Sequence, residues 1–160
     1  MLDIQQADLT LPSHAQAVVD LLDAYACDPM GGGQPLQECV RSGLIGELQK
    51  RNDVLILLAF VDGTPVGLMN CFEGFSTFKC KPLLNIHDVV VLKAYRGQGI
   101  AQKLFAAVEK IALQRGYCKL TLEVLEGNKV AQSVYRQVGF SDYELDPATG
   151  RALFWEKVLP

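Results

Sequence analysis

One segment constrains the fold of this 160-residue chain more than any other. Residues 83–92 are almost continuously apolar, which is typical of a strand that is covered on both faces. A turn containing Gly97 and Gly99 follows, and apolar residues then recur at helical spacing until Gly116. The pattern predicts a buried strand that passes through a glycine turn directly into a long amphipathic helix.

The turn has the chemistry of an anion-binding site. The first N–H groups of a helix have no partner inside the helix, and they carry a partial positive charge. Gly97 and Gly99 have no side chain that would keep a ligand away from those groups, and Arg96 adds a permanent cation. The turn therefore predicts a socket for a phosphate or pyrophosphate. The alternative is a plain strand-to-helix turn with a surface arginine.

Two common phosphate motifs do not fit this turn. A Walker loop needs Gly-Lys-Ser/Thr, which is absent here. A dinucleotide fingerprint needs Gly or Ala at the position that Gln102 occupies, and it normally lies in the first strand-helix-strand unit.

The turn resembles the acetyl-CoA loop of the GNAT superfamily of N-acetyltransferases. That pattern is Arg or Gln, two residues, Gly, one residue, then Gly or Ala, which matches Arg96, Gly99 and Ala101. Residues 128–140 resemble the second signature of the family, with an Asn, an Ala three residues on, a Tyr four after that and a closing Gly-Phe pair. The combined resemblance covers about residues 54–158.

The resemblance implies acetyl-CoA as co-substrate and assigns it a set of residues. The backbone of three strand residues would pair with the pantetheine arm, and the N–H groups of the turn would hold the pyrophosphate. The implied cofactor-binding residues are Val89, Val90, Val91, Arg96, Gly97, Gln98, Gly99, Ile100, Ala101, Gln102, Asn128 and Ala131. Asn128 could also act only as the N-cap of the helix that follows, because Asn is a preferred N-cap residue.

Two residues are candidates for proton transfer. Tyr135 matches the family's tyrosine that protonates the departing thiolate, although a half-buried helix tyrosine would look the same in sequence. Spermidine/spermine N-acetyltransferases, which this chain also resembles, place a glutamate two residues before the cofactor-pairing strand residues, where this chain has His87. Histidine is a plausible base at neutral pH. A core histidine is the alternative, and Asp88, expected on the opposite strand face, is a second candidate base.

The acceptor is less constrained than the cofactor. A primary amine of a small molecule, attacking directly in a ternary complex, is the leading expectation. A protein lysine or N-terminus, or a CoA-binding domain without catalysis, remains open. Polyamine specificity is not established, because Asp23 and Asp28 are the only acids near the end of the first helix.

Composition excludes several other classes of function. The net charge is −3 and no basic block occurs, so nucleic acid is not an expected partner. No apolar run has the length of a membrane span, and none resembles a signal segment. The five cysteines are odd in number and lack zinc spacing, so we expect neither metal nor disulfides, but small buried thiols in a cytoplasmic protein.

The expected fold class is α/β (α+β), with the GNAT order β-α-α-β-β-β-α-β-α-β-β in a single domain over residues 1–160. The central sheet should be mixed but mostly antiparallel, with six or seven strands and helices on both faces. Residues 73–82 should form a loop. Leu153, Phe154 and Trp155 are candidate contacts of a homodimer or ordinary core residues. The expected strands are 2–7, 54–61, 66–72, 83–92, 118–125, 140–145 and 152–158, and the expected helices are 14–25, 35–50, 100–116 and 128–138.

Overall fold

The computed structural model describes residues 1–159, and it is mixed α/β as expected. The chain divides into two compact units, Met1–Leu122 and a second unit that begins at Glu123. The helices and strands are β1 (Leu2–Gln6), α1 (Pro12–Ala26), α2 (Glu38–Gln49), β2 (Val54–Val61), β3 (Thr64–Ser76), β4 (Lys81–Val91), α3 (Ile100–Gln114), β5 (Leu120–Leu122) and α4 (Lys129–Gln137), with short 3-10 turns η1 (Pro29–Gly31) and η2 (Lys93–Tyr95).

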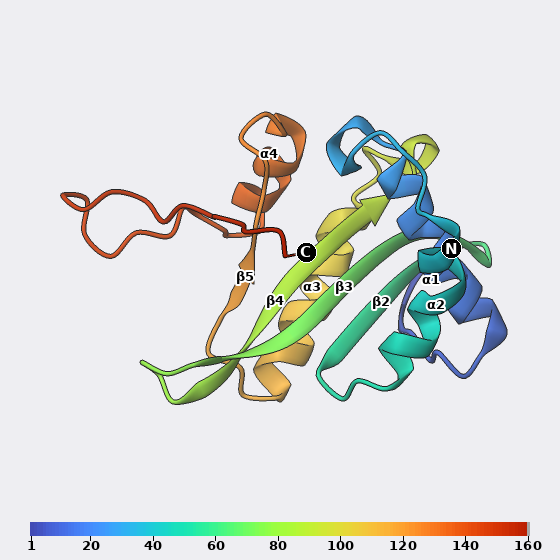
Figure 1. Ribbon diagram of the computed structural model, residues 1–160, viewed down its shortest axis with the longest axis horizontal. Helices are drawn as coiled ribbons and strands as arrows, with labels where there is room; N and C mark the ends of the chain where they lie inside the picture. Colours follow the sequence, from blue (N-terminus) through green and yellow to red (C-terminus); the bar gives the residue numbers. More distant parts are fainter. Residues whose placement is uncertain (160) are drawn as a thin grey trace. The chain divides into compact units, whose positions relative to one another are not determined.

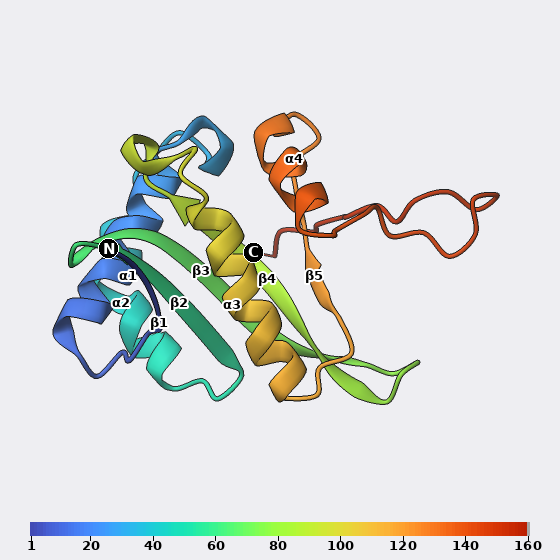
Figure 2. The ribbon, with the colours of Figure 1, turned by 180° about the vertical axis from the view of Figure 1, so that it is seen from behind.

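The first unit is built around one five-stranded sheet in the order β1-β2-β3-β4-β5. Neighbouring strands are antiparallel except for β4 and β5, which are parallel. The helix α3 covers one face of this sheet, and α1 and α2 cover the other (Figures 1 and 2). This arrangement confirms the predicted mixed, mostly antiparallel sheet with helices on both faces.

Apolar periodicity explains how the helices attach to the sheet. The inward stripe of α3 is buried, as the sequence predicts, except that Ile111 is only half-buried. Gly67 of β3 allows the first turn of α3 to approach closely, because a Cβ there would lie 3.3 Å from Cγ2 of Ile100 and 3.1 Å from Cβ of Ala59. The opposite face has its own core, formed by Ala17, Val18, Leu21, Leu48, Ile56, Leu58, Leu68 and Val90. The start of α3 is thus fixed against the centre of the sheet.

The expected loop over residues 73–82 is wrong. β3 continues to Ser76 and β4 begins at Lys81, so the two strands pair as a long hairpin down to Ser76–Lys81. Once two antiparallel strands are aligned, extending their ladder satisfies further backbone groups whatever the side-chain pattern is.

The sheet also has fewer strands than predicted. Within residues 123–159 the expected strands 140–145 and 152–158 are replaced by one isolated bridge between Glu144 and Arg151, and β5 spans only three residues of the expected 118–125. A strand needs a hydrogen-bonded neighbour, and the alternating pattern of residues 140–158 does not specify one. Leu153, Phe154 and Trp155 are exposed, so their alternative interpretation as core residues is wrong.

The cysteines are free, but they are not all buried. Cys71 is buried, whereas Cys27, Cys39 and Cys80 are exposed and Cys118 is half-buried. Burial raises the pKa of the Cys71 thiol to about 12, and the negative charge of Asp88 adds to this effect. Expecting every cysteine to be buried was wrong, because small residues in turns need not face a core.

Candidate active site

The predicted strand–turn–helix is present, and its two glycines are needed for the backbone. Gly97 has φ 77° and Gly99 has φ 76°, which is the left-handed region that favours glycine. Gly99 is the N-cap of α3, and no side chain within residues 1–159 caps this helix start. A Cβ placed on either glycine would meet no described atom within 4 Å. The backbone N–H groups at this turn are therefore accessible to an anion, as the sequence predicts for a phosphate site.

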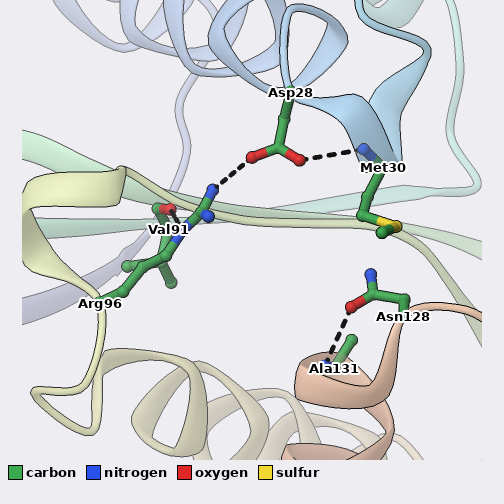
Figure 3. Close-up of polar contacts among 6 residues, drawn as sticks. All are labelled: Asp28, Met30, Val91, Arg96, Asn128 and Ala131. Carbon is green, nitrogen blue, oxygen red and sulfur yellow. Dashed lines mark hydrogen bonds and ion pairs between the residues drawn. The ribbon is translucent and has the colours of Figure 1, made fainter.

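Arg96 does more than add a cation to the turn. Its Nε donates to the carbonyl oxygen of Val91 at 2.9 Å, and its guanidinium forms an ion pair with Asp28 at 2.9 Å (Figure 3). The other carboxylate oxygen of Asp28 accepts from the N–H of Met30 in η1. Arg96 therefore connects the end of β4 to the loop between α1 and α2. Arg96 was predicted from the sequence, but its pairing with Asp28 was not, because a pairing over 68 positions leaves no local pattern.

The ion pair predicts a pH-dependent stability. The Met30 N–H and the Arg96 guanidinium hold the pKa of Asp28 below its ordinary value of 3.8. A carboxyl whose pKa is lowered by folding stabilises the folded chain above pH 3.8, and this contribution is lost as the pH falls through the lowered pKa.

Asp28→Asn should therefore lower the free energy of unfolding by about 1 kcal/mol at pH 7, since the pair is partly exposed. The difference in free energy of unfolding between the variant and the unaltered protein should become smaller below pH 3.8. Urea unfolding followed by circular dichroism between pH 7 and pH 2.5 would measure this difference. A difference that stays constant over this range would contradict the assigned role of the carboxylate.

Within residues 1–159, β4 has no paired strand on its outer edge beside the turn. β4 pairs with β5 only from Leu84 to Ile86, while Val89–Val91 pair with β3 on their other side. The N–H of Leu92 donates to Val66 of β3, so alternation directs the backbone groups of Val89 and Val91 away from β3. The carbonyl of Val91 accepts from Arg96, whereas Val89 can pair with an added extended segment. This geometry fits the amides of a pantetheine arm.

A β-bulge lies where the sequence places the candidate bases. The register of β3 and β4 shifts between Asn70 and Cys71, because Asn70 is opposite Asp88 while Cys71 is opposite Ile86. His87 is the extra residue. The ring of His87 lies edge-on to the ring of Phe72, with 5.6 Å between the centroids, and Asp88 accepts a hydrogen bond from Asn70. Phe72 and Asn70 are two positions apart in β3, so they share one face of the sheet. His87 and Asp88 therefore point to the same face, and the prediction of opposite faces was wrong because a bulge interrupts alternation.

His87 is exposed, so its alternative interpretation as a core histidine is wrong. Asn85 lies opposite Phe72 and shares the face of His87, but its side-chain amide donates to the Thr121 hydroxyl of β5 at 3.1 Å. Asn85 therefore connects two strands.

The second unit contains the second sequence signature as a helix, α4. The Oδ1 of Asn128 accepts from the N–H of Ala131 at 3.1 Å, which confirms Asn128 as the cap of α4 (Figure 3). Tyr135 is half-buried, and its ring lies 6.3 Å from that of Phe140 between centroids. The cofactor contacts of Asn128 and Ala131 and the catalytic role of Tyr135 stay predictions.

Comparison with known proteins decides the family. The model of the acetyltransferase (GNAT) family matches residues 19–140, which is more than half of the chain. The chain belongs to the GNAT family of acetyltransferases. This confirms the predicted family.

Relatives and solved structures agree with the GNAT assignment. The chain is 31% identical over 111 residues to the thialysine N-epsilon-acetyltransferase of Bos taurus, a match that covers 66% of this chain and 65% of that protein. The chain thus spans slightly less than two thirds of this relative. An aminoglycoside acetyltransferase from an uncultured soil metagenomic sample has a TM-score of 0.75 at 20% identity, covering 99% of this chain and 97% of that one. An aminoglycoside N-acetyltransferase in complex with CoA has a TM-score of 0.73 at 20% identity, with 98% and 95% covered. These structures support the GNAT fold.

Three further acids of the first unit have internal partners. Asp23 accepts from the N–H of Leu36 at 2.9 Å and pairs with Arg41 at 3.3 Å, so it joins α1 to α2. Asp28 pairs with Arg96, and Glu73 accepts from the hydroxyl of Tyr117 at 2.6 Å. Asp23 and Asp28, the two acids that the sequence offered for recognition of a polyamine, are thus used within this GNAT fold itself.

β3 contains a buried amide that was not predicted from the sequence. Asn70 is 5% exposed, lies opposite Asp88 and donates to it at 3.0 Å. An asparagine between Met69 and Cys71 in an otherwise apolar strand is a signal that could have been noticed, because a buried amide needs partners.

Across residues 1–159 no helix is both long and apolar enough to cross a membrane.

Proposed function

We propose that this protein transfers the acetyl group of acetyl-CoA to a primary amine of a small molecule, by direct attack within a ternary complex. The observation that carries the proposal is the open edge of β4 at Val89–Val91, which leads to an uncapped helix start with Gly97 and Gly99. An extended arm can add to the strand edge, and its diphosphate can accept from the turn. The bovine relative, named for an amine acceptor, supports a small-molecule amine.

The proposed cofactor site uses backbone groups for most of its contacts. Val89 presents its N–H and C=O groups at the strand edge, and Val91 presents its N–H there, because the Val91 carbonyl accepts from Arg96. Gly97, Gly99 and Ile100 present N–H groups at the turn. Arg96 maintains the shape of this corner through its ion pair with Asp28. Gln98, Ala101, Gln102, Asn128 and Ala131 belong to the proposed site through the family signatures, and Val90 supports it from the core.

In the proposed reaction, His87 takes one proton from the acceptor, which enters as an ammonium. The neutral amine attacks the thioester carbonyl carbon, so that a C–N bond forms and the C–S bond breaks. Tyr135 donates its phenolic proton to the departing thiolate and recovers a proton from the amide nitrogen. The products are the acetamide and free CoA, and the net proton released remains on His87.

A screen of primary amines tests this proposal. Acetyl-CoA and each amine are incubated with the protein, and release of the CoA thiol is followed with a thiol reagent. Turnover with small amines but not with lysine-containing peptides is the expected result. Turnover with peptides alone would favour a protein acetyltransferase, and CoA binding without turnover with any amine would leave only a CoA-binding role.

His87→Gln should lower kcat by about tenfold in this assay, because it removes the group that takes the acceptor proton while keeping a polar side chain. The other histidine provides a matched control, since the Nδ1 of His14 accepts from the N–H of Asp8 and belongs to the β1–α1 connection. His14→Gln should leave kcat unchanged. Equal rates for His87→Gln and the unaltered protein at pH 7 would remove His87 from the mechanism.

The proposal extends to the molecule as a whole. We propose that both units together form one catalytic domain, and that the protein works in the cytoplasm, where its free thiols stay reduced. We also propose a homodimer, because Leu153, Phe154 and Trp155 expose 73%, 78% and 83% of their surface. Analytical ultracentrifugation would test this last point.

A further inference from the structure

The loop between α1 and α2 is folded onto itself. The N–H of Gly31 donates to the carbonyl oxygen of Asp28 at 2.8 Å, and the N–H of Gln34 donates to the carbonyl oxygen of Ala26 at 3.1 Å. Gly31 lies so close to the end of α1 that a Cβ on it would overlap the carbonyl oxygen of Tyr25. A loop closed by its own backbone bonds opens and closes as one piece.

A chain of three bonds ties this loop to the end of β4. Oδ1 of Asp28 accepts from the N–H of Met30 at 3.0 Å, and Oδ2 accepts from Nη2 of Arg96 at 2.9 Å (Figure 3). Nε of Arg96 donates in turn to the carbonyl oxygen of Val91 at 2.9 Å. The ion pair is the middle bond, so it connects η1 on the loop side with the strand that leads into the cofactor turn.

Arg96 can hold Asp28 and an anion at the same time. It directly precedes Gly97 of the turn, and its side chain is 50% exposed. A guanidinium has five N–H groups. Within residues 1–159 the bonds to Val91 and Asp28 use two of them, so three remain for an anion. An anion bound at the turn therefore orders Arg96 without displacing Asp28.

The loop follows the end of α1 on the sheet face that carries the bulge. Tyr25 in the last turn of α1 packs against the same apolar cluster as Phe72, the residue that His87 contacts. Burial, and then the charges of Asp88 and Asp28, raise the pKa of Tyr25, because its phenol lies near both carboxylates. The position of the loop thus shapes the space beside the proposed base.

We propose that Asp28 is a positioning residue that couples the α1–α2 loop to the cofactor turn through Arg96. CoA bound at the turn stabilises the closed loop, and the closed loop strengthens CoA binding by the same factor, because coupling between two sites is reciprocal. The inference rests on the proposed function, since it takes the turn as the CoA site. One partly exposed ion pair can carry a coupling of about threefold to fivefold.

Hydrogen–deuterium exchange of the full-length protein, resolved by NMR, measures the loop without any turnover. The N–H groups of Gly31 and Gln34 are bonded within the closed loop, so they exchange when it opens. Saturating CoA should slow their exchange about threefold to fivefold in the unaltered protein. In Asp28→Asn, CoA should leave these exchange rates unchanged, and calorimetry should show CoA affinity reduced by about the same factor.

The outcomes separate this inference from the proposed function. An unaltered protein that does not bind CoA would refute the proposed function and the coupling with it. CoA binding without slower exchange at Gly31 and Gln34 would overturn the coupling alone. Slowing that persists in Asp28→Asn would also overturn it.

Asp23→Asn is the matched control, because Asp23 stabilises the other end of the same loop. Its carboxylate accepts from the N–H of Leu36 and pairs with Arg41, so these bonds join α1 to α2. Asp23→Asn should speed exchange at Gly31 and Gln34 with and without CoA, yet keep the slowing that CoA causes. Loss of this slowing in Asp23→Asn would assign the effect to loop stability in general and overturn the role of Asp28.

A double-mutant cycle tests whether Asp28 acts through Arg96. Arg96→Gln removes the same ion pair from the other side and keeps a residue that the GNAT pattern allows at this position. Adding Asp28→Asn to Arg96→Gln should change CoA affinity less than 1.5-fold, roughly the limit for an interaction that is already absent. A further loss as large as that of Asp28→Asn alone would show independent action and refute the positioning role.

Discussion

Gly99→Asp is expected to weaken binding of CoA by about a hundredfold. Gly99 is the N-cap of α3 with φ 76°, and a side chain there would project into open space beside the first N–H groups of the helix. Coulomb's law gives a repulsion of about 3 kcal/mol between a carboxylate at this point and the diphosphate, for a separation of about 5 Å between the charges and an effective dielectric constant of about 20. Isothermal titration calorimetry with CoA measures the loss.

Gly99→Asn is the matched control for this experiment. Asn and Asp have nearly the same size, and both tolerate the left-handed conformation better than other side chains. Their difference therefore isolates charge from backbone strain and from occlusion of the turn. Gly99→Asn should weaken CoA binding by tenfold or less. Equal losses in the two variants would mean that the turn does not hold an anion, and that the glycine is required for the backbone alone.

Tyr135→Phe is expected to lower kcat by a factor of between 10² and 10⁴ and to leave the Kd of CoA within about twofold. The change removes one hydroxyl and preserves the ring that contacts Phe140, so α4 should remain folded. Steady-state thiol release gives kcat, and calorimetry gives the affinity. A loss of kcat with an unchanged Kd of CoA is expected for a proton donor, because the donor acts on the departing thiolate and not on the bound cofactor.

Tyr143→Phe provides a comparison within the same unit, because this tyrosine is 56% exposed and lies outside the GNAT signature. It should leave kcat unchanged. A parallel loss of kcat and CoA affinity in Tyr135→Phe would assign the tyrosine to cofactor binding, and an unchanged kcat would remove it from the reaction.

The comparison of the two substitutions separates binding from chemistry. Gly99→Asp should raise the concentration of acetyl-CoA needed for half-maximal rate, whereas Tyr135→Phe should lower the rate at saturation.

Much of the first unit could be predicted from the sequence because its signals are local. The apolar run of β2 predicted Val54–Val61 with both ends correct, since turn residues flank it. The stripe that starts at Ile100 predicted α3, since helical spacing shows in a few turns of chain. Gly97 and Gly99 predicted the turn before α3, because a positive φ restricts the residue type at the position itself.

The predictions that were wrong depended on contacts between distant segments. The strands expected over residues 140–158 needed a paired neighbour, and alternation alone cannot supply one. The opposite faces expected for His87 and Asp88 followed from regular alternation, which the bulge opposite Asn70 interrupts. The length of the β3–β4 hairpin depended on a register that neither strand specifies by itself.

The sequence by itself determined the GNAT family, the strand–turn–helix and the two glycines of its turn, because backbone conformation and periodicity depend on neighbouring residues. The tertiary structure alone decided that Arg96 pairs with Asp28, and that Asn70 donates to Asp88. Those pairs join residues 68 and 18 positions apart. Such partners are selected by sheet register and helix packing, which only the folded chain establishes.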